Sequence, residues 1–415
     1  MQNTLQSGSA QPAPSMPART FDAWVEGLRG LAALLVAAEH LSLMGILYPS
    51  DRISPWLRFF GAGQAAVLVF FVLSGYVISL TNQVPFTAGR ARAYLGRRAV
   101  RLLPIYWLAL ALTFCVSLGD SPKIYAAAAL MLQNENPYGP WLLHPPRANG
   151  PMWSLHYEMI YYFLFLVIWR REQWFPVSML AAVAFSMAGW VLPDFPRFIA
   201  GYASGWLFWG AGWWLARQTQ SHDAVPHVPL LAGVFLLIGT HHLACGNIFL
   251  SGIGLPPKDI STVNLSNLAS LPCCLLLVSG AARRVLPCQR LLTWLAFGIP
   301  VGTSLLLIVT GRLGEMPQWI AGALFTAMAL PVAAWRSGAW LRWLAPMGSI
   351  SYAFYLLHMP MFWVVRRLGL AANSPLSFAR AALIWFSLTT AMAAVLELWL
   401  QPRLRRWWKA RAAIT

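Results

Sequence analysis

The stretch LRGLAALLVAAEHLSLMGIL, residues 28–47, decides the fold, because only three of its 20 side chains are charged or carry an imidazole. A helix of this length rises about 30 Å, which matches the hydrocarbon core of a bilayer. Comparable apolar runs follow at residues 67–80 and 265–280, and others recur along the whole chain. The sequence therefore predicts an all-α, polytopic transmembrane helix bundle.

The composition agrees with a membrane protein and excludes an ordinary soluble one. Of the 415 residues, 58% are hydrophobic and 10% are charged, whereas soluble domains carry about a quarter charged residues. The net charge of +17 has a simple source, because Lys and Arg accumulate on the cytoplasmic loops of membrane proteins. We expect a lipid bilayer as the partner of this charge, and no nucleic acid.

The five cysteines and the first residues of the chain indicate no further site. The cysteines lie mostly within or beside apolar runs and lack paired CxxC spacing, so we expect packing residues and no metal site. Residues 1–20 are rich in Gln, Ser, Pro and Ala and lack the apolar core of a cleavable signal peptide. They are predicted to form a disordered cytoplasmic tail.

Counting apolar windows gives ten to twelve spans. The number falls to ten if two weak spans between residues 174 and 281 drop out as a pair. The twelve candidate windows lie near residues 28–48, 62–82, 101–119, 152–169, 174–192, 199–216, 228–245, 264–281, 291–310, 317–335, 347–365 and 380–400.

The distribution of basic residues sets the orientation. With the amino terminus inside, ten of the 30 Lys and Arg residues fall on outer loops, and the remaining 20 fall on the cytoplasmic side. This bias places both termini in the cytoplasm. The expected organisation is a membrane domain over residues 21–402, followed by a basic cytoplasmic tail over residues 403–415. The ten outer residues are Arg52, Arg58, Lys123, Arg147, Arg197, Lys258, Arg312, Arg366, Arg367 and Arg380.

The first span carries two polar residues on one helical face. Arg29 and His40 are 11 residues apart, which is three turns plus about 20° and a rise of about 16 Å. Arg29 either binds a ligand at the cytoplasmic boundary or reaches the lipid headgroups. His40 lies deep in an apolar span, where it is either a proton relay or catalytic base, or a histidine hydrogen-bonded between helices. Glu39 lies about 100° around the helix, where it faces a polar partner or stays neutral.

A basic stretch precedes the third span. Residues 90–101 hold five arginines, of which Arg98 and Arg101 are spaced i, i+3 on one helical face. Planar guanidinium groups at this spacing suit a phosphate or pyrophosphate. The alternative is a loop whose charge serves only to orient the chain. A binding role is favoured because Arg29, Arg98 and Arg101 are all predicted at the same membrane face.

Two further spans carry polar residues at helical spacing. Ser154 and Glu158 share a face of the fourth span, and a carboxylate at that depth requires a cationic or hydroxyl partner. It either binds substrate or transfers a proton, or it holds helices together. In the eleventh span, Gly348, Tyr355 and His358 belong to a polar stripe that lines either a cavity or a helix contact.

The outer loop between the third and fourth spans, residues 119–151, is rich in Asn and aromatic residues, including Asn134, Asn136 and Trp141. Such a loop suits contacts with sugars, and a solvated connector explains it equally well.

Five stretches together resemble the acyltransferase family 3 membrane proteins, which include O-acyltransferases that modify lipopolysaccharide and exopolysaccharide. The stretches occur in the family's order over residues 22–360 and read VEGLRGLAALLVAAEH, VFFVLSGYVISL, RRAVRLLPIYWL, WSLHYEMIYYF and GSISYAFYLLHMP. The resemblance implies a bacterial-type inner membrane protein with acyl-coenzyme A as donor substrate and no permanently bound cofactor. It implies a hydroxyl of a carbohydrate or glycolipid as the acceptor.

The resemblance also assigns residues. It maps the family's essential first-span arginine and histidine onto Arg29 and His40, and the arginine pair that opens the third span onto Arg98 and Arg101. The Trp-Ser-Leu-x-x-Glu match points to Ser154 and Glu158. We therefore expect His40 and Glu158 to be catalytic and the three arginines to bind the donor. Supporting roles are expected for Glu26, Glu39, Ser154, Tyr355 and His358.

Three positions depart from the usual family pattern. Glu26 stands where Asp is more frequent, Glu39 precedes the histidine in place of an apolar or aromatic residue, and Met159 replaces a frequent second acid. The VEGLRG form looks closest to the exopolysaccharide branch. The chain ends soon after the last span, so we expect no appended extracytoplasmic esterase-like domain.

Other classes of function fit parts of the pattern. Buried His and Glu residues in a polar cavity also suit a transporter or flippase for a glycan or lipid-linked precursor. A different membrane acyltransferase fold with a His and Asn pair is not favoured by the Arg-x10-His spacing. A non-catalytic assembly subunit leaves His40 unexplained.

Overall fold

The computed structural model describes residues 22–43, 58–218, 229–256, 261–335, 338–370 and 374–412. Regular structure in these ranges is helical, and the β contacts are two isolated bridges, Gln133 with Leu143 and Tyr138 with Leu142. The all-α prediction is confirmed for this part of the chain. The predicted disordered tail, residues 1–20, lies outside the described residues.

The helices follow one another with short connections. The α-helices are α1 (Ala23–Leu43), α3 (Gly63–Thr81), α4 (Ala88–Cys115), α5 (Pro122–Ala129), α6 (Trp153–Arg170), α7 (Phe175–Val191), α8 (Arg197–Leu215), α9 (Leu230–His242), α10 (Cys245–Gly252), α11 (Leu271–Ala282), α12 (Gln289–Val309), α13 (Pro317–Val332), α14 (Ala345–Ser349), α15 (Ser351–Arg367), α16 (Pro375–Ala394) and α17 (Gln401–Ala412). The short helical turns are η1 (Arg58–Phe60), η2 (Arg147–Met152), η3 (Glu172–Trp174), η4 (Leu265–Ser270), η5 (Leu313–Glu315), η6 (Ala339–Leu344) and η7 (Val395–Leu400).

Six helical segments in the described residues are long and apolar enough to cross a membrane. A seventh arises if α9 and α10, which meet at a bend of 50°, form one broken span. The ten to twelve predicted spans are therefore not reached on length and composition alone. One reason is that α1 carries three charged residues and α6 begins with a His and a Glu. The six segments are Gly63–Thr81, Ala88–Cys115, Glu172–Val191, Leu265–Ala282, Gln289–Val309 and Pro375–Arg411.

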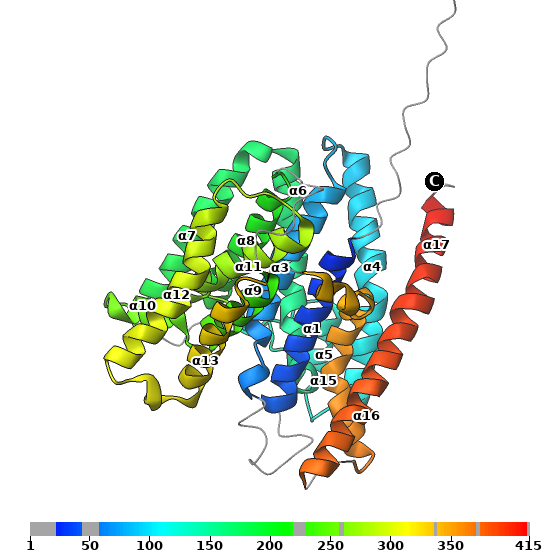
Figure 1. The fold of residues 1–415 in the computed structure, drawn as a ribbon. Helices are drawn as coiled ribbons and strands as arrows, with labels where there is room; N and C mark the ends of the chain where they lie inside the picture. Colours follow the sequence, from blue (N-terminus) through cyan, green and yellow to red (C-terminus); the bar gives the residue numbers. More distant parts are fainter. Residues whose placement is uncertain are drawn as a thin grey trace, which may run out of the picture.

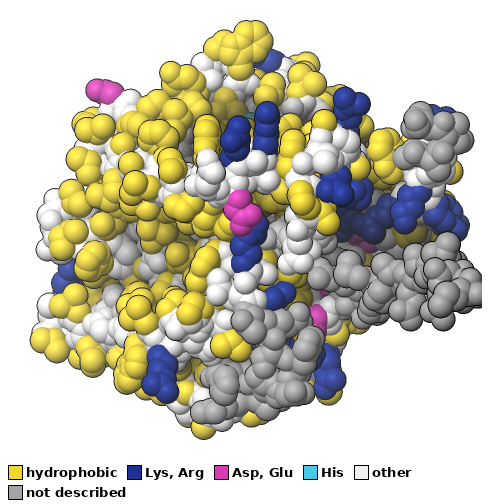
Figure 2. All heavy atoms as spheres, turned by 90° about the horizontal axis from the view of Figure 1, so that it is seen from above, with side chains coloured by type: hydrophobic (Ala, Val, Ile, Leu, Met, Phe, Trp, Pro, Cys, Tyr) yellow, Lys and Arg dark blue, Asp and Glu magenta, His cyan; other side chains and the backbone are white. Residues whose placement is uncertain are grey.

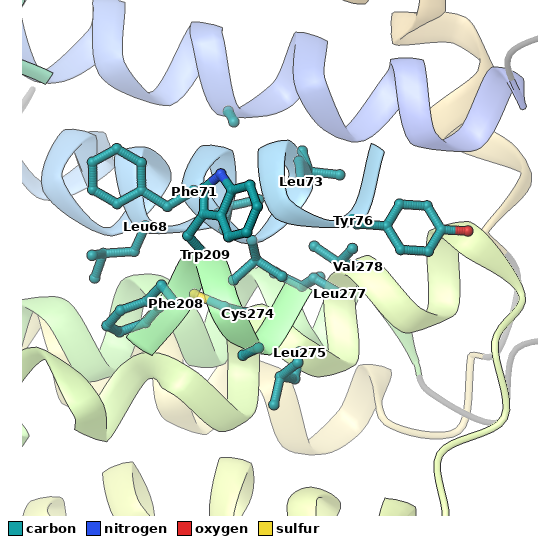
Figure 3. Packing of buried hydrophobic residues seen from close by; sticks show 14 of the residues in the cluster. Leu68, Phe71, Leu73, Tyr76, Phe208, Trp209, Cys274, Leu275, Leu277 and Val278 are labelled. Carbon is teal, nitrogen blue, oxygen red and sulfur yellow. The ribbon is translucent and has the colours of Figure 1, made fainter. Parts of the chain in front are cut away.

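Helix α3 lies at the centre of the larger core, packed against α1, α8 and α11. Figure 3 shows side chains of α3, α8 and α11 interleaved, with Phe71 and Trp209 between the ribbons. Two glycines make the α3–α8 contact possible. A Cβ on Gly75 would lie 1.9 Å from the Trp209 carbonyl oxygen, and one on Gly212 would lie 1.9 Å from that of Val72. Small residues of this kind let membrane helices approach closely.

A second close contact fixes the first turn of α1. A Cβ on Gly27 would lie 1.9 Å from the Leu341 carbonyl oxygen, and one on Gly348 would lie 1.9 Å from that of Glu26. Gly348, which the sequence placed in a polar stripe, is thus a packing residue that joins α14 to α1. The contact holds the beginning of α1 beside the beginning of α15.

The polar ends of several helices meet at one end of the bundle, at the top of Figure 1. The beginnings of α1, α4 and α15, the end of α3 and the whole of α17 lie toward this end, while α7 to α13 form the other side of the molecule (Figure 1). The last span is one long helix, because α16, the π-helical η7 and α17 are continuous. Residues 403–412 of the predicted basic tail are therefore helical.

Candidate active site

A cavity of about 1090 Å³ opens among α1, α3, α4, α6, α15 and the last helix. Most of the residues singled out from the sequence line it, although they come from four separate stretches. These residues are Glu26, Arg29, Arg98, Arg101, Ser154, Glu158 and Tyr355. Three other predicted residues, Glu39, His40 and His358, are not part of its wall.

The cavity wall is basic. Six Arg or Lys side chains face three carboxylates around it, a formal surplus of three positive charges. In Figure 2, which views the molecule from above, Lys and Arg atoms gather beside a hollow on the side where α4 and α17 stand in Figure 1. Such a concentration of guanidinium groups favours an anionic ligand with several phosphate oxygens. The charged wall residues are Glu26, Arg29, Arg97, Arg98, Arg101, Glu158, Glu397, Arg405 and Lys409.

Arg98 is held by two aromatic rings and retains hydrogen-bonding capacity. Its guanidinium carbon lies 5.8 Å from the ring centre of Tyr94 and 5.7 Å from that of Tyr162. Its Nε is buried and finds no hydrogen-bond acceptor among the described residues. An unsatisfied buried donor is costly unless a ligand or water accepts from it. Arg98 is therefore suited to bind a ligand in the cavity.

Arg101 differs from Arg98, although the sequence suggested an equivalent pair. Its Nη1 donates to Glu397 Oε2, and only 3% of the Glu397 side chain is exposed. Glu397 Oε1 also accepts from the backbone N–H of Ala353 at 3.3 Å. The charge of Arg101 is thus balanced within the protein.

Glu397 lies 296 residues after Arg101 and was not predicted from the sequence. The available signal was a carboxylate in the apolar stretch VLELWL, because such a carboxylate requires a cation or donor nearby.

Two carboxylates remain in the cavity wall. Arg29 Nη1 lies 3.2 Å from Glu26 Oε1, one helical turn away. Glu158 accepts from Ser74 Oγ at 3.0 Å and from the Tyr162 hydroxyl. The hydroxyl partners expected for Glu158 are thus present. Ser74 was not singled out from the sequence, because one Ser in an apolar helix usually bonds its own backbone.

The two predicted histidines contact each other outside the wall of the cavity. The rings of His40 and His358 lie edge to face with their centres 5.0 Å apart. The Tyr355 ring centre lies 5.7 Å from that of His358, and its hydroxyl is 2.7 Å from Ser154 Oγ, which lines the cavity. His358 is fully buried, and its Nε2 has no hydrogen-bond partner in the described ranges. The link from the cavity wall to His40 therefore consists of one hydrogen bond, between Ser154 and Tyr355, followed by two ring contacts.

Glu39 points away from this link. Its Oε2 accepts from the backbone N–H of Gly63 at the start of α3 and lies 3.9 Å from His241 Nε2. The negative charge suits the amino end of a helix. Its expected support of His40 remains a prediction, and His241 is a neighbour that the sequence pattern did not indicate.

The outer loop of residues 119–151, for which sugar contacts and a solvated connector were both considered, turns part of its polar surface inward. Glu135 Oε1 accepts from Ser261 Oγ at 2.7 Å and from the Tyr157 hydroxyl at 3.0 Å. Burial raises the pKa of the Glu135 carboxyl above its ordinary value of 4.5. Asn134 is also buried, whereas Trp141 is 76% exposed. We call Glu135, Tyr157 and Ser261 the Glu135 cluster. It joins the loop to α6 and to residues 261–263.

The described residues contain no group of three His, Cys, Asp or Glu side chains placed to hold a metal ion. The site is a basic cavity in a helix bundle, next to a histidine pair in which His358 is buried and His40 is half-buried. The chain belongs to acyltransferase family 3, because the acyltransferase domain model of that family matches residues 22–398. It is therefore a membrane O-acyltransferase.

A more distant similarity joins the chain to one characterised relative. The exopolysaccharide production protein ExoZ of Rhizobium meliloti (strain 1021) is 27% identical over 253 residues. The match covers 54% of this chain and 70% of the relative. No solved structure shows a significant match.

Proposed function

We propose that the protein transfers an acyl group, most simply acetyl, from acyl-coenzyme A to a hydroxyl of a carbohydrate. The acceptor class is an exopolysaccharide, a lipopolysaccharide or a lipid-linked glycan, and the name of the Rhizobium relative favours the first. The observation that carries the proposal is the basic cavity of about 1090 Å³ whose wall continues through Ser154 and Tyr355 to the His40–His358 pair.

The orientation of the protein follows the distribution of its basic residues. We place the protein in an inner, plasma-type membrane with both termini in the cytoplasm and ten to twelve spans. The beginnings of α1 and α4 then face the cytoplasm, where acyl-coenzyme A is available. Arg29 and Arg98 bind phosphates of the donor, and its extended arm reaches into the bundle. The rise of about 16 Å from Arg29 to His40 along α1 matches such a reach.

The tautomer of His40 supports a role in proton transfer. Its Nδ1 lies 2.8 Å from the Val36 carbonyl oxygen, and a carbonyl only accepts, so Nδ1 carries the hydrogen. The lone pair is then on Nε2, as a base or nucleophile requires. As a base, Nε2 takes the proton of the acceptor hydroxyl. The oxygen of this hydroxyl attacks the thioester carbonyl at the same time. The C–S bond breaks, and the thiolate leaves and takes up a proton.

A covalent route uses the same nitrogen. Nε2 attacks the thioester carbonyl and the C–S bond breaks, so that the thiolate leaves and an acyl-imidazole forms. The acceptor hydroxyl then attacks the acyl carbonyl, the bond to Nε2 breaks, and the proton of the hydroxyl passes to the thiolate. Glu158 lies among hydroxyl donors in the cavity wall, where it accepts and returns protons along this path.

The decisive experiment compares wild type with His40→Ala and with His144→Ala, a loop histidine that is exposed. Purified proteins are incubated with radiolabelled acetyl-coenzyme A and a polysaccharide extract, and both free coenzyme A and label in the acceptor are measured. A catalytic base contributes about 100-fold or more, so transfer should fall at least that far in His40→Ala and stay unchanged in His144→Ala.

Near-normal turnover in folded His40→Ala would exclude the proposed role of this histidine. No consumption of donor by wild type, over several acyl lengths and extracts, would favour a transporter or flippase instead.

A further inference from the structure

The last helix contributes to the cavity, although the family match ends before it. The match stops at residue 398, whereas α17 begins at Gln401. Arg405, Trp408 and Lys409 of α17 nevertheless line the cavity together with the residues of α4. This part of the wall is therefore a property of the chain beyond the matched domain.

Helix α17 is held against α4 by specific contacts. Gln401 Nε2 donates to the Val100 carbonyl oxygen at 2.9 Å, and Trp408 packs on Gly96, where a Cβ would lie 2.5 Å from the indole ring. One turn earlier in the same long helix, Glu397 pairs with Arg101. These contacts place α17 beside the mouth of the cavity rather than free in the cytoplasm.

Part of the positive charge at the mouth of the cavity comes from α17. Glu397 neutralises Arg101, so Arg98 is left as the buried cation of α4 with an unpartnered donor atom in the described structure. Arg405 and Lys409 are spaced i, i+4 and therefore present their charges on the same face of α17. Arg405 lies near enough to Arg98 and Arg101 for their charges to interact. Glu397, which is already paired with Arg101, also interacts with Arg405 and offsets part of the repulsion among these like charges.

We propose that Arg405 and Lys409 form, with Arg98, a subsite for the phosphates at the nucleotide end of coenzyme A. The inference rests on the proposed function and extends it to residues outside the matched domain. The ligand class is a nucleoside with a 3′-phosphate and a 5′-diphosphate, and these three phosphates need more cations than Arg98 and the Glu26-paired Arg29 supply. The subsite holds the nucleotide between α4 and α17 and leaves the thioester arm directed into the bundle.

The test is a charge-neutral double variant with a matched control on the same helix. Arg405→Gln with Lys409→Gln removes the two charges at the cavity. Arg403→Gln with Arg406→Gln removes two charges from α17 at positions that do not line it. Affinity for adenosine 3′,5′-bisphosphate and for coenzyme A is measured by calorimetry in phosphatidylcholine nanodiscs. The KM for acetyl-coenzyme A is measured in parallel.

We expect the first pair to weaken both ligands at least 10-fold and to raise KM with little change in kcat, and the control pair to change affinity less than 2-fold. Equal affinities in the two double variants would overturn the subsite while leaving the proposed function intact if wild type consumes acetyl-coenzyme A. Absence of both binding and consumption in wild type would overturn the proposed function as well.

A phosphate on a lipid headgroup shares the chemistry of the nucleotide phosphates. The measurements are therefore repeated in nanodiscs that contain phosphatidylglycerol. A difference between the two double variants that appears only with the anionic lipid would assign Arg405 and Lys409 to headgroups and overturn the subsite.

Discussion

The basic cavity and the Glu135 cluster both gather polar residues from distant segments, but they treat them differently. In the Glu135 cluster, Ser261 and Tyr157 donate to one carboxyl oxygen, Glu135 Oε2 is buried without a partner in the described residues, and none of the three residues lines the basic cavity. In the cavity, Arg98 keeps a donor unused beside about 1090 Å³ of space. Polar groups that satisfy one another stabilise the fold, whereas groups that face a cavity await a ligand. Both kinds of polar group occur within one turn of α4, because Arg101 is paired with Glu397 and Arg98 keeps an unused donor.

The largest effect should come from breaking the Arg101–Glu397 pair. Removing one partner leaves a buried charge uncompensated and should destabilise the protein by about 3 kcal/mol. We expect Arg101→Gln and Glu397→Gln each to lower the thermal unfolding temperature in detergent. The double variant should lose less stability than the two single variants together.

Strict additivity of the two changes would contradict the pairing. It would return Arg101 to the role of a donor-binding arginine that the sequence suggested.

A smaller effect, on ligand rather than fold, is expected at Arg98. Arg98→Gln should raise the KM for acetyl-coenzyme A about 10-fold, since one charge-assisted contact is worth about 1.5 kcal/mol or more. Its unfolding temperature should stay close to that of wild type, because no carboxylate of the described residues forms an ion pair with Arg98. Steady-state kinetics and a thermal melt of the same sample measure both quantities. A stability loss as large as that of Arg101→Gln would remove the distinction between the two arginines.

The smallest effect concerns the Glu135 cluster and appears as a dependence on pH. The pKa of Glu135 is raised above 4.5 in the folded protein, so folding favours its protonated form. Its contribution to stability is therefore full below the ordinary value of 4.5 and is lost as the pH rises through the folded pKa. The unfolding temperatures of wild type and Glu135→Gln are measured from pH 4 upward. That of wild type should fall relative to that of Glu135→Gln as the pH rises. Parallel curves would show that Glu135 ionises as freely in the folded protein as in the unfolded chain.

Much of the site was predictable because its polar residues recur at helical spacing within single helices. Arg29 and His40 share a face of α1, and the spacing of Tyr355 and His358 predicted a polar stripe. The structure shows that His358 of this stripe contacts His40. Helical periodicity and the cost of a polar side chain in a bilayer suffice for such cases. The assignment of catalytic and binding roles to these residues remains a prediction.

The pairings between distant helices were not predictable. No local pattern joins Arg101 to Glu397, or Glu39 to His241, because tertiary packing alone decides which residues of two helices meet. The number of spans was likewise not predictable from composition. Ala244, in a left-handed conformation, interrupts an apolar stretch between α9 and α10, and composition does not reveal such a break.

The glycine contacts that join α1 to η6 and to α14 have a mechanical consequence. Gly27 and Gly348 bring backbone against backbone, so neither helix is able to slide without a collision. The cationic mouth on α1 and the histidine pair shared with α15 are thereby held at one fixed separation. Under the proposed function, a fixed separation of this kind would favour donors whose thioester lies at a matching distance from their phosphates.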